Sequence, residues 1–176
     1  HDVRVEETPG VLSDHYDPGA KAVRLSSENY RGTSVAAATI AAHEVGHAIQ
    51  HAKGYFPVVL RSQMAPVFGL GSQLGPLLFM AGILLGTVMG LSPDLSFGIA
   101  LIGVALFGFT VLFHIVTLPV ELDASGRALK VLAGSQFLTA QEMPGAKRVL
   151  TAAAFTYVAT ALYALLQLGY YVLHLM

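Results

Sequence analysis

Two histidines and a glutamate stand together in the pentapeptide His43-Glu44-Val45-Gly46-His47. On a helix, side chains four residues apart lie on one face, one turn apart, so His43 and His47 can bind one zinc ion. Glu44 follows the first histidine and can serve as general base toward a zinc-activated water. The pattern predicts a zinc hydrolase with His43 and His47 as metal ligands and Glu44 as the catalytic residue.

This chemistry requires the pentapeptide to lie on a helix, and the flanking residues favour one. Thr33 or Ser34 is suited to be the N-cap, an Ala-rich stretch follows, and Gly54 is a good stop signal. We therefore expect a helix over Ser34–Lys53. His51 extends the four-residue spacing, but it lies about 12 Å along the axis from the first histidine, too far to share its metal. It suits the helix C-terminus instead.

The composition is that of a membrane protein. Hydrophobic residues make up 54% of the 176 residues and charged residues only 12%, against about 25% in ordinary soluble domains. Balanced charges without a basic block exclude a nucleic-acid binder, and the lack of cysteine excludes thiolate zinc sites. Uncharged runs of 32, 26 and 28 residues are each long enough to cross a bilayer. The expected spans are Pro66–Met89, Leu95–Leu118 and Val149–Leu173.

These features predict a mostly α fold: an integral membrane helical bundle with a small α+β, zincin-like cytoplasmic part. Short strands are expected at Val3–Glu6, Leu12–Tyr16 and Lys21–Leu25, the last two forming a hairpin. We expect four segments. Residues 1–61 carry the hairpin and the histidine helix, residues 62–118 form a transmembrane hairpin, residues 119–148 form a helical segment with the third zinc ligand, and residues 149–176 form the third span.

The distribution of positive charge predicts the orientation in the membrane. Residues 1–61 and 119–148 must share one side, because two spans and a short connector separate them. All ten lysines and arginines lie on that side, which the positive-inside rule places in the cytoplasm. The expected location is the bacterial inner (plasma) membrane, with the active site facing the cytoplasm.

A zinc hydrolase needs a third protein ligand and an open coordination position. Two carboxylates, Glu121 and Asp123, follow the second apolar run, and Pro119 fits the first position of a helix that would begin there. On a helix the two carboxylates face opposite ways, so only one of them reaches the metal. Glu121 has the longer reach. His15, on a predicted strand, is a further candidate, and the residues alone leave the choice open.

Several segments resemble the bacterial membrane neutral zinc metallopeptidases, the YugP-like family. They are His43–Gln50, Leu118–Ala124, and the stretch Asp14–Pro18 followed by Val23–Ser26, and the similarity covers essentially the whole chain. The resemblance implies a gluzincin-type site with a downstream acidic ligand, and it favours Glu121. Asp123 would then support the site or pair with Arg127.

The resemblance also implies one more transmembrane helix upstream of His1. Better-known gluzincins often place an Asp four residues after the ligand Glu, where this chain has Ser125. The group that orients a ligand histidine is therefore left open.

The resulting hypothesis is a zinc-dependent, membrane-bound endopeptidase with Zn²⁺ as its cofactor. Its expected partners are the lipid bilayer and peptide or membrane-protein substrates, without nucleic acid. One edge of the predicted hairpin can accept an extended substrate as an added strand. The alternative is a catalytically silent membrane scaffold or assembly factor that retains the zinc site, although an intact Glu44 argues against it. A zinc transporter is less consistent, because the spans contain almost no ligating residues.

Overall fold

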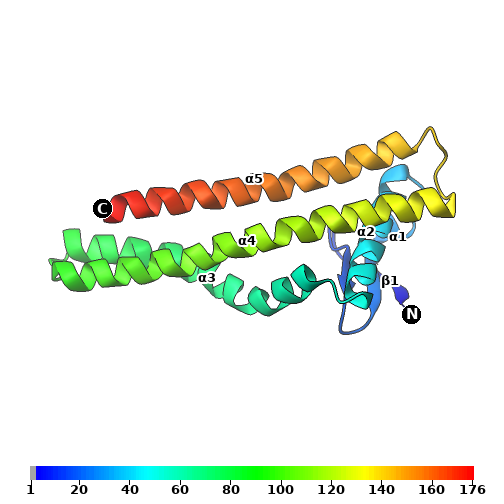
Figure 1. Cartoon of the computed structure of the whole chain (residues 1–176). Coiled ribbons are helices and arrows are strands. Elements are labelled where there is room, and N and C mark those ends of the chain that lie inside the picture. Colours follow the sequence, from blue (N-terminus) through cyan, green and yellow to red (C-terminus); the bar gives the residue numbers. More distant parts are fainter. Residues whose placement is uncertain (1–2) are drawn as a thin grey trace. The chain divides into compact units, whose positions relative to one another are not determined.

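The computed structural model of this chain describes residues 3–176 and contains two compact units (Figure 1). Unit 1 comprises His1–Val59 and Leu118–Thr156, and unit 2 comprises Leu60–Thr117 and Tyr157–Met176. Three long helices contribute residues to both units: α3 (Phe56–Thr87), α4 (Pro93–Ser135) and α5 (Met143–Leu175). All the residues expected to form the zinc site belong to unit 1.

Unit 1 begins with a three-stranded sheet in the order β1-β3-β2. Its strands are β1 (Arg4–Thr8), β2 (His15–Asp17) and β3 (Ala22–Ser26). The predicted hairpin is the antiparallel pair of β2 and β3. The first predicted strand pairs with β3 in parallel, which leaves β2 at one edge of the sheet. Parallel pairing joins residues distant in sequence, so no local turn signal announces it.

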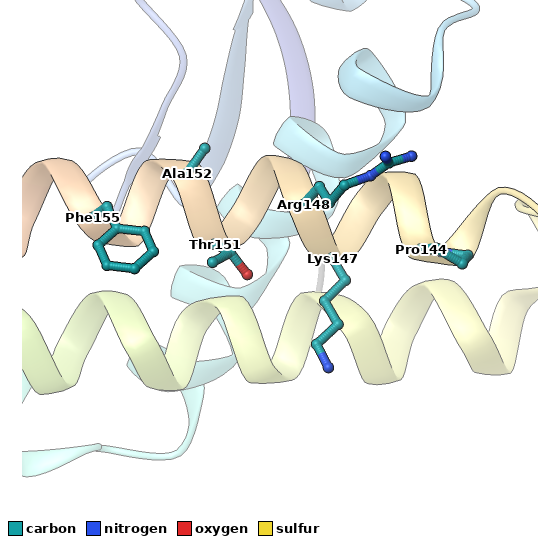
Figure 2. Close-up of a pocket in the computed structure, with 6 residues that line it drawn as sticks. All are labelled: Pro144, Lys147, Arg148, Thr151, Ala152 and Phe155. Carbon is teal, nitrogen blue, oxygen red and sulfur yellow. The ribbon is translucent and has the colours of Figure 1, made fainter.

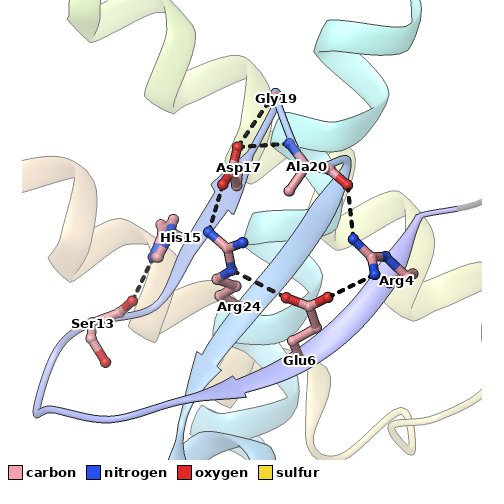
Figure 3. A network of polar contacts seen from close by, with 8 residues as sticks. All are labelled: Arg4, Glu6, Ser13, His15, Asp17, Gly19, Ala20 and Arg24. Atoms are coloured by element: carbon pink, nitrogen blue, oxygen red, sulfur yellow. Dashed lines mark hydrogen bonds and ion pairs between the residues drawn. The ribbon is translucent and has the colours of Figure 1, made fainter.

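One face of this sheet is polar and is held by Arg24 of the central strand (Figure 3). Its guanidinium forms ion pairs with Glu6 on β1 and Asp17 on β2. Asp17 also accepts hydrogen bonds from the backbone N–H groups of Gly19 and Ala20, at 2.8 and 3.0 Å. This is an Asx turn, which closes the hairpin at the position where the sequence predicted a turn.

The helix that carries the two histidines is α2 (Val35–Ala52), which follows the short helix α1 (Ser27–Tyr30). The Ser34 side chain accepts a hydrogen bond from the Ala37 N–H at 3.1 Å, as an N-cap does. Beyond the other end, Gly54 adopts a φ of 60°, the left-handed conformation that favours glycine after a helix. The predicted helix and its stop signal are thus confirmed.

Small apolar side chains join three helices in the core of unit 1. Ala42 of α2, Ala128 and Leu132 of α4, and Ala146 and Leu150 of α5 form one buried cluster. Because most of these side chains are small, the helices can approach closely. This core fixes the distance between α2 and the part of α4 that follows Leu118.

The expectation that a helix begins at Pro119 is wrong, because α4 passes through Pro119 and ends at Ser135. A proline inside a helix removes one backbone hydrogen bond and crowds the preceding turn. The sequence therefore favoured a helix that begins at this proline. Helices rich in apolar residues tolerate such prolines when neighbouring groups satisfy the freed carbonyl. The acidic segment is therefore a continuation of the second apolar helix.

Unit 2 is a helical bundle with an apolar core, formed by parts of α3, α4 and α5. Phe79, Phe107 and Tyr171 pack together in this core, one from each helix, with the Tyr171 ring centroid 4.2 Å from that of Phe79 and 5.3 Å from that of Phe107. A Cβ on Gly82 of α3 would collide with the backbone of α4 at Ser96 and Ala100, so glycine lets these two apolar helices pack closely, as small residues do between membrane helices. Gly90 has another role: it lies beyond the end of α3 and adopts a φ of 66°, a left-handed conformation that favours glycine.

The three long helices are each long and apolar enough to cross a membrane. At most 33% of their most apolar windows is buried within the protein, so most of this apolar surface faces outward, as contact with lipid requires. The predicted fold, a mostly α membrane bundle with a small α+β part, is confirmed.

In unit 1, α2 and α4 are in close contact at Gly46, between the two histidines. A Cβ at this position would collide with the backbone carbonyl of Ala124 on α4. Ala124 is fully buried, so neither partner has room to move. Glycine at position 46 therefore sets how near α4 can bring its own side chains to the two histidines.

We predict that Gly46→Ala destabilises unit 1 by about 1–3 kcal/mol, the usual cost of overpacking a core, and lowers zinc content. Gly126→Ala is the matched control, because a Cβ on this exposed glycine of α4 meets nothing within 4 Å. This control should be neutral or stabilising, by up to about 1 kcal/mol, since alanine favours a helix. Thermal unfolding and zinc content in detergent provide the test, and equal effects of the two changes would contradict the role of Gly46.

Candidate metal centre and active site

The two histidines of α2 present their rings side by side, as their spacing predicted. The ring centroids of His43 and His47 lie 4.8 Å apart, with the ring planes nearly perpendicular at 87°. Both side chains are largely buried, with 15% and 13% of their surface exposed. Their Nε2 atoms point toward a shared partner on α4.

That shared partner is Glu121, whose side chain is almost completely buried. One carboxylate oxygen, Oε2, lies 3.2 Å from His43 Nε2 and 3.5 Å from His47 Nε2. The ligating atoms of all three residues lie within 4.8 Å of one another. The structure thus brings together the three residues that the sequence analysis favoured as metal ligands.

The spacing of these atoms fits a zinc ion. Zinc–ligand bonds of about 2.0–2.1 Å in tetrahedral geometry separate neighbouring ligand atoms by roughly 3.3 Å. The distances from Glu121 to the two histidines bracket that value. Two imidazoles and one carboxylate also match the donor set of catalytic zinc sites, which keep a fourth position for water or substrate.

The outer nitrogens of both histidines have partners that fix the rings. Ser125 Oγ lies 3.3 Å from His43 Nδ1, and Gln50 Oε1 lies 3.0 Å from His47 Nδ1. When Nε2 binds a metal, a neutral imidazole carries its proton on Nδ1, and each partner oxygen can accept that hydrogen bond. Ser125 therefore occupies the orienting position that the sequence analysis left open.

Gln50 is the residue of this site that the sequence analysis missed. Its side chain is fully buried, and its amide nitrogen donates to the Val120 carbonyl and to Asp123 Oδ2, both at 2.8 Å. The signal was available, because Gln50 lies three residues after His47 and so shares its helix face. A buried glutamine requires hydrogen-bond partners, and the candidate ligand His47 is one of them.

Asp123 does not join the three ligating residues. Its carboxylate accepts hydrogen bonds from Gln50 and from Arg127 Nε, the latter at 2.6 Å. Asp123 thus supports Gln50 and pairs with Arg127 one turn further along α4. The structure places the carboxylate in the outer layer of the site.

His15, the other candidate ligand, lies on the polar face of the sheet beside Arg24 (Figure 3). Its Nδ1 contacts the Ser13 carbonyl at 2.7 Å. Successive residues of a strand face opposite sides, and the next residue, Tyr16, contacts His51 of α2 at 2.9 Å. His15 therefore points away from the helix that carries the two histidines. His51 lies in the last turn of α2, as expected.

The candidate base, Glu44, is buried beside the two histidines, with 8% of its surface exposed. Burial raises the pKa of its carboxyl above the ordinary value, although the nearby histidines and a hydrogen bond from the Tyr16 backbone N–H oppose the shift. A raised pKa brings a carboxylate closer to the range in which it accepts and returns protons near neutral pH. The same backbone N–H ties Glu44 to strand β2.

The electrostatics of the ligand pair favour a cation. Burial lowers the pKa of His47, but the hydrogen bond and negative charge of Glu121, the negative charge of Glu44 and the hydrogen bond to Gln50 together outweigh burial and raise the pKa above the ordinary value. The buried carboxylates of Glu44 and Glu121 therefore attract positive charge to the space between the histidines. A divalent metal supplies that charge more completely than a proton does.

Comparisons with known proteins agree with this chemistry. The whole chain, residues 1–176, matches the family model described as "Putative neutral zinc metallopeptidase". The chain is 44% identical over 168 residues to the "Putative membrane protease YugP" of Bacillus subtilis (strain 168), an alignment that covers 96% of this chain and 71% of that protein. No solved structure matches the chain.

The third ligand can be tested by removing each carboxylate of α4 in turn. We predict that Glu121→Ala loses bound zinc, because it removes one of three converging ligand atoms. Asp123→Ala should keep a zinc stoichiometry near one and weaken affinity by about 10–100-fold, the usual effect of losing an outer partner. Metal analysis of each folded, detergent-solubilised variant provides the measurement. An empty site in Asp123→Ala beside a full one in Glu121→Ala would reverse the assignment.

Proposed function

Since the chain belongs to the neutral zinc metallopeptidase family, we propose that it is a membrane-bound zinc endopeptidase that hydrolyses peptide bonds. The observation that carries this proposal is the convergence of His43, His47 and Glu121 beside the buried Glu44. A structural zinc site is closed by four protein ligands and needs no base. Three ligands with an adjacent carboxylate support hydrolysis.

Each residue of the proposed site has a distinct task. His43, His47 and Glu121 hold the zinc ion, and Ser125 and Gln50 keep the two imidazoles in the required tautomer and orientation. When bound, zinc supplies a Lewis acid that polarises the scissile carbonyl and makes water more acidic. Glu44 accepts a proton from the attacking water at its carboxylate and returns it to the leaving amine.

We further propose that the substrate binds in an extended conformation along β2. This strand lies at the edge of the sheet, and the Tyr16 N–H on it already contacts the proposed base. A peptide added to this edge would gain backbone hydrogen bonds and pass close to Glu44. The sheet order and the contact between Tyr16 and Glu44 support this position.

Membrane proteins and their cytoplasmic segments are the proposed substrate class. The proposed location is the bacterial inner membrane, with the zinc site facing the cytoplasm. Three long apolar helices and the similarity to a membrane protease support the membrane. The positions of all ten lysines and arginines support the orientation.

We predict that Glu44→Gln keeps its zinc and loses proteolysis. Glutamine is nearly isosteric, and Glu44 is not proposed as a ligand, but an amide cannot accept the proton; the expected loss is at least about 100-fold. The measurements are metal content and cleavage of labelled casein by purified protein in detergent. Glu28→Gln, at an exposed position of α1, is the matched control and should keep full activity. An active Glu44→Gln variant would end the proposed mechanism.

The proposed orientation predicts opposite results for two reporter positions. A reporter inserted in the loop between α4 and α5, residues 136–142, should lie in the cytoplasm with the positive charges. A reporter fused after Met176 should lie outside, because α5 separates the two positions. Alkaline phosphatase and green fluorescent protein fusions in a bacterial host measure this. The reverse pattern would place the zinc site outside the cytoplasm.

A further inference from the structure

A pocket of about 520 Å³ in unit 1 is lined by three basic side chains. Lys53 is the C-cap residue that directly follows α2, and Arg127 and Lys130 come from α4. We call this site the basic pocket. Among residues 3–176, Asp123 is the one carboxylate that lines it. Three cations and one carboxylate leave this cavity with a net positive charge, which attracts an anion.

The two lysines are not engaged elsewhere. Both are exposed, and within residues 3–176 neither forms an ion pair with a carboxylate. The Asp123 carboxylate already accepts the hydrogen bonds of Arg127 and Gln50. Burial raises the pKa of Asp123, but the hydrogen bond from Arg127 and, among smaller causes, the charge of Lys130 lower it. Lys130 has this effect without forming an ion pair with Asp123, so the ammonium groups of Lys53 and Lys130 both keep their hydrogen-bond donors for a ligand.

Arg127 is held in place before any ligand binds. Its Nε donates to Asp123 at 2.6 Å, and its guanidinium carbon lies 5.8 Å from the centre of the Tyr55 ring. Nε carries the bond to Asp123, so the two terminal nitrogens keep their donors for another acceptor. A fixed guanidinium loses little side-chain entropy when it binds an oxyanion.

Another basic surface of unit 1 provides a contrast. Lys147 and Arg148 line a more open pocket near the start of α5, whose lining residues all come from that one helix (Figure 2). In this view the two side chains project to opposite sides of the helix. They do not converge as the residues of the basic pocket do, and no second element closes the space. Both pockets are thus positively charged, but only the basic pocket is lined by residues of two helices.

We propose that the basic pocket binds a phosphate group. A guanidinium and two ammonium groups supply several donors and enough charge for a doubly charged tetrahedral anion. The cavity is larger than phosphate itself, so it leaves room for the rest of a phosphate ester. Both an anionic phospholipid headgroup and a soluble phosphate ester carry the required chemistry. This inference is independent of the proposed proteolysis.

The first test titrates inorganic phosphate into the full chain in a nonionic detergent free of phospholipid, at constant ionic strength, by calorimetry. We expect saturable binding that weakens about tenfold in both Lys53→Gln and Lys130→Gln, as for the loss of one charge-assisted hydrogen bond. Lys147→Gln, with the same change of charge on α5, is the matched control and should stay within about twofold of wild type. Equal weakening in the control would mean non-specific attraction and overturn the proposal.

A second arm distinguishes the two sources of the phosphate. Short-chain phosphatidylglycerol, below its micelle concentration, is compared with inorganic phosphate on the same proteins. Tighter binding of the lipid, lost in both pocket variants, identifies a headgroup site, and the reverse order identifies a soluble ester. Thermal unfolding confirms that each variant is folded. If neither probe binds saturably to the wild type, or if the pocket variants bind both probes as well as the wild type does, the proposal is wrong.

Discussion

The close approach of α2 and α4 at Gly46 is the constraint on which the rest of the site depends. The proposed metal ligands come from two segments far apart in the sequence, and only helix packing can bring their side chains within bonding distance of one ion. Ala124, which faces Gly46, lies three residues after Glu121 and thus on the same face of α4. The contact that sets the distance between the helices therefore also sets the register of Glu121 against the two histidines.

The hydrogen bonds behind the ligands reinforce the same packing. The side-chain amide nitrogen of Gln50 reaches from α2 to the Val120 carbonyl and to Asp123 on α4. Its side-chain oxygen Oε1 contacts His47 Nδ1. One buried side chain thereby links the helix interface to the orientation of a ligand. Burying an amide is costly unless its donors and acceptor are all satisfied, and here they are. Gln50 therefore makes the fold and the site interdependent.

Local signals in the sequence were enough to predict the elements that carry the chemistry. Periodic histidines, an N-cap serine and a terminal glycine defined α2, and the uncharged runs defined the three long helices. Long-range relations were not encoded locally. The parallel pairing of β1 with β3 and the contact of Gln50 with the Val120 carbonyl both join residues distant in the chain. The choice between Glu121 and Asp123 rested on helix periodicity and on family resemblance, since neither carboxylate is distinctive alone.

The chain of contacts from His47 through Gln50 and Asp123 ends at Arg127, which lines the basic pocket. Each member shares its polar atoms between two neighbours, so the position of one constrains the next. Asp123 Oδ2 accepts hydrogen bonds from both Gln50 and Arg127, so this one atom joins the two halves of the series of contacts. An anion that drew Arg127 away from Asp123 would leave that carboxylate held by Gln50 alone. The support of a proposed metal ligand and the charge of the basic pocket thus depend on the same carboxylate.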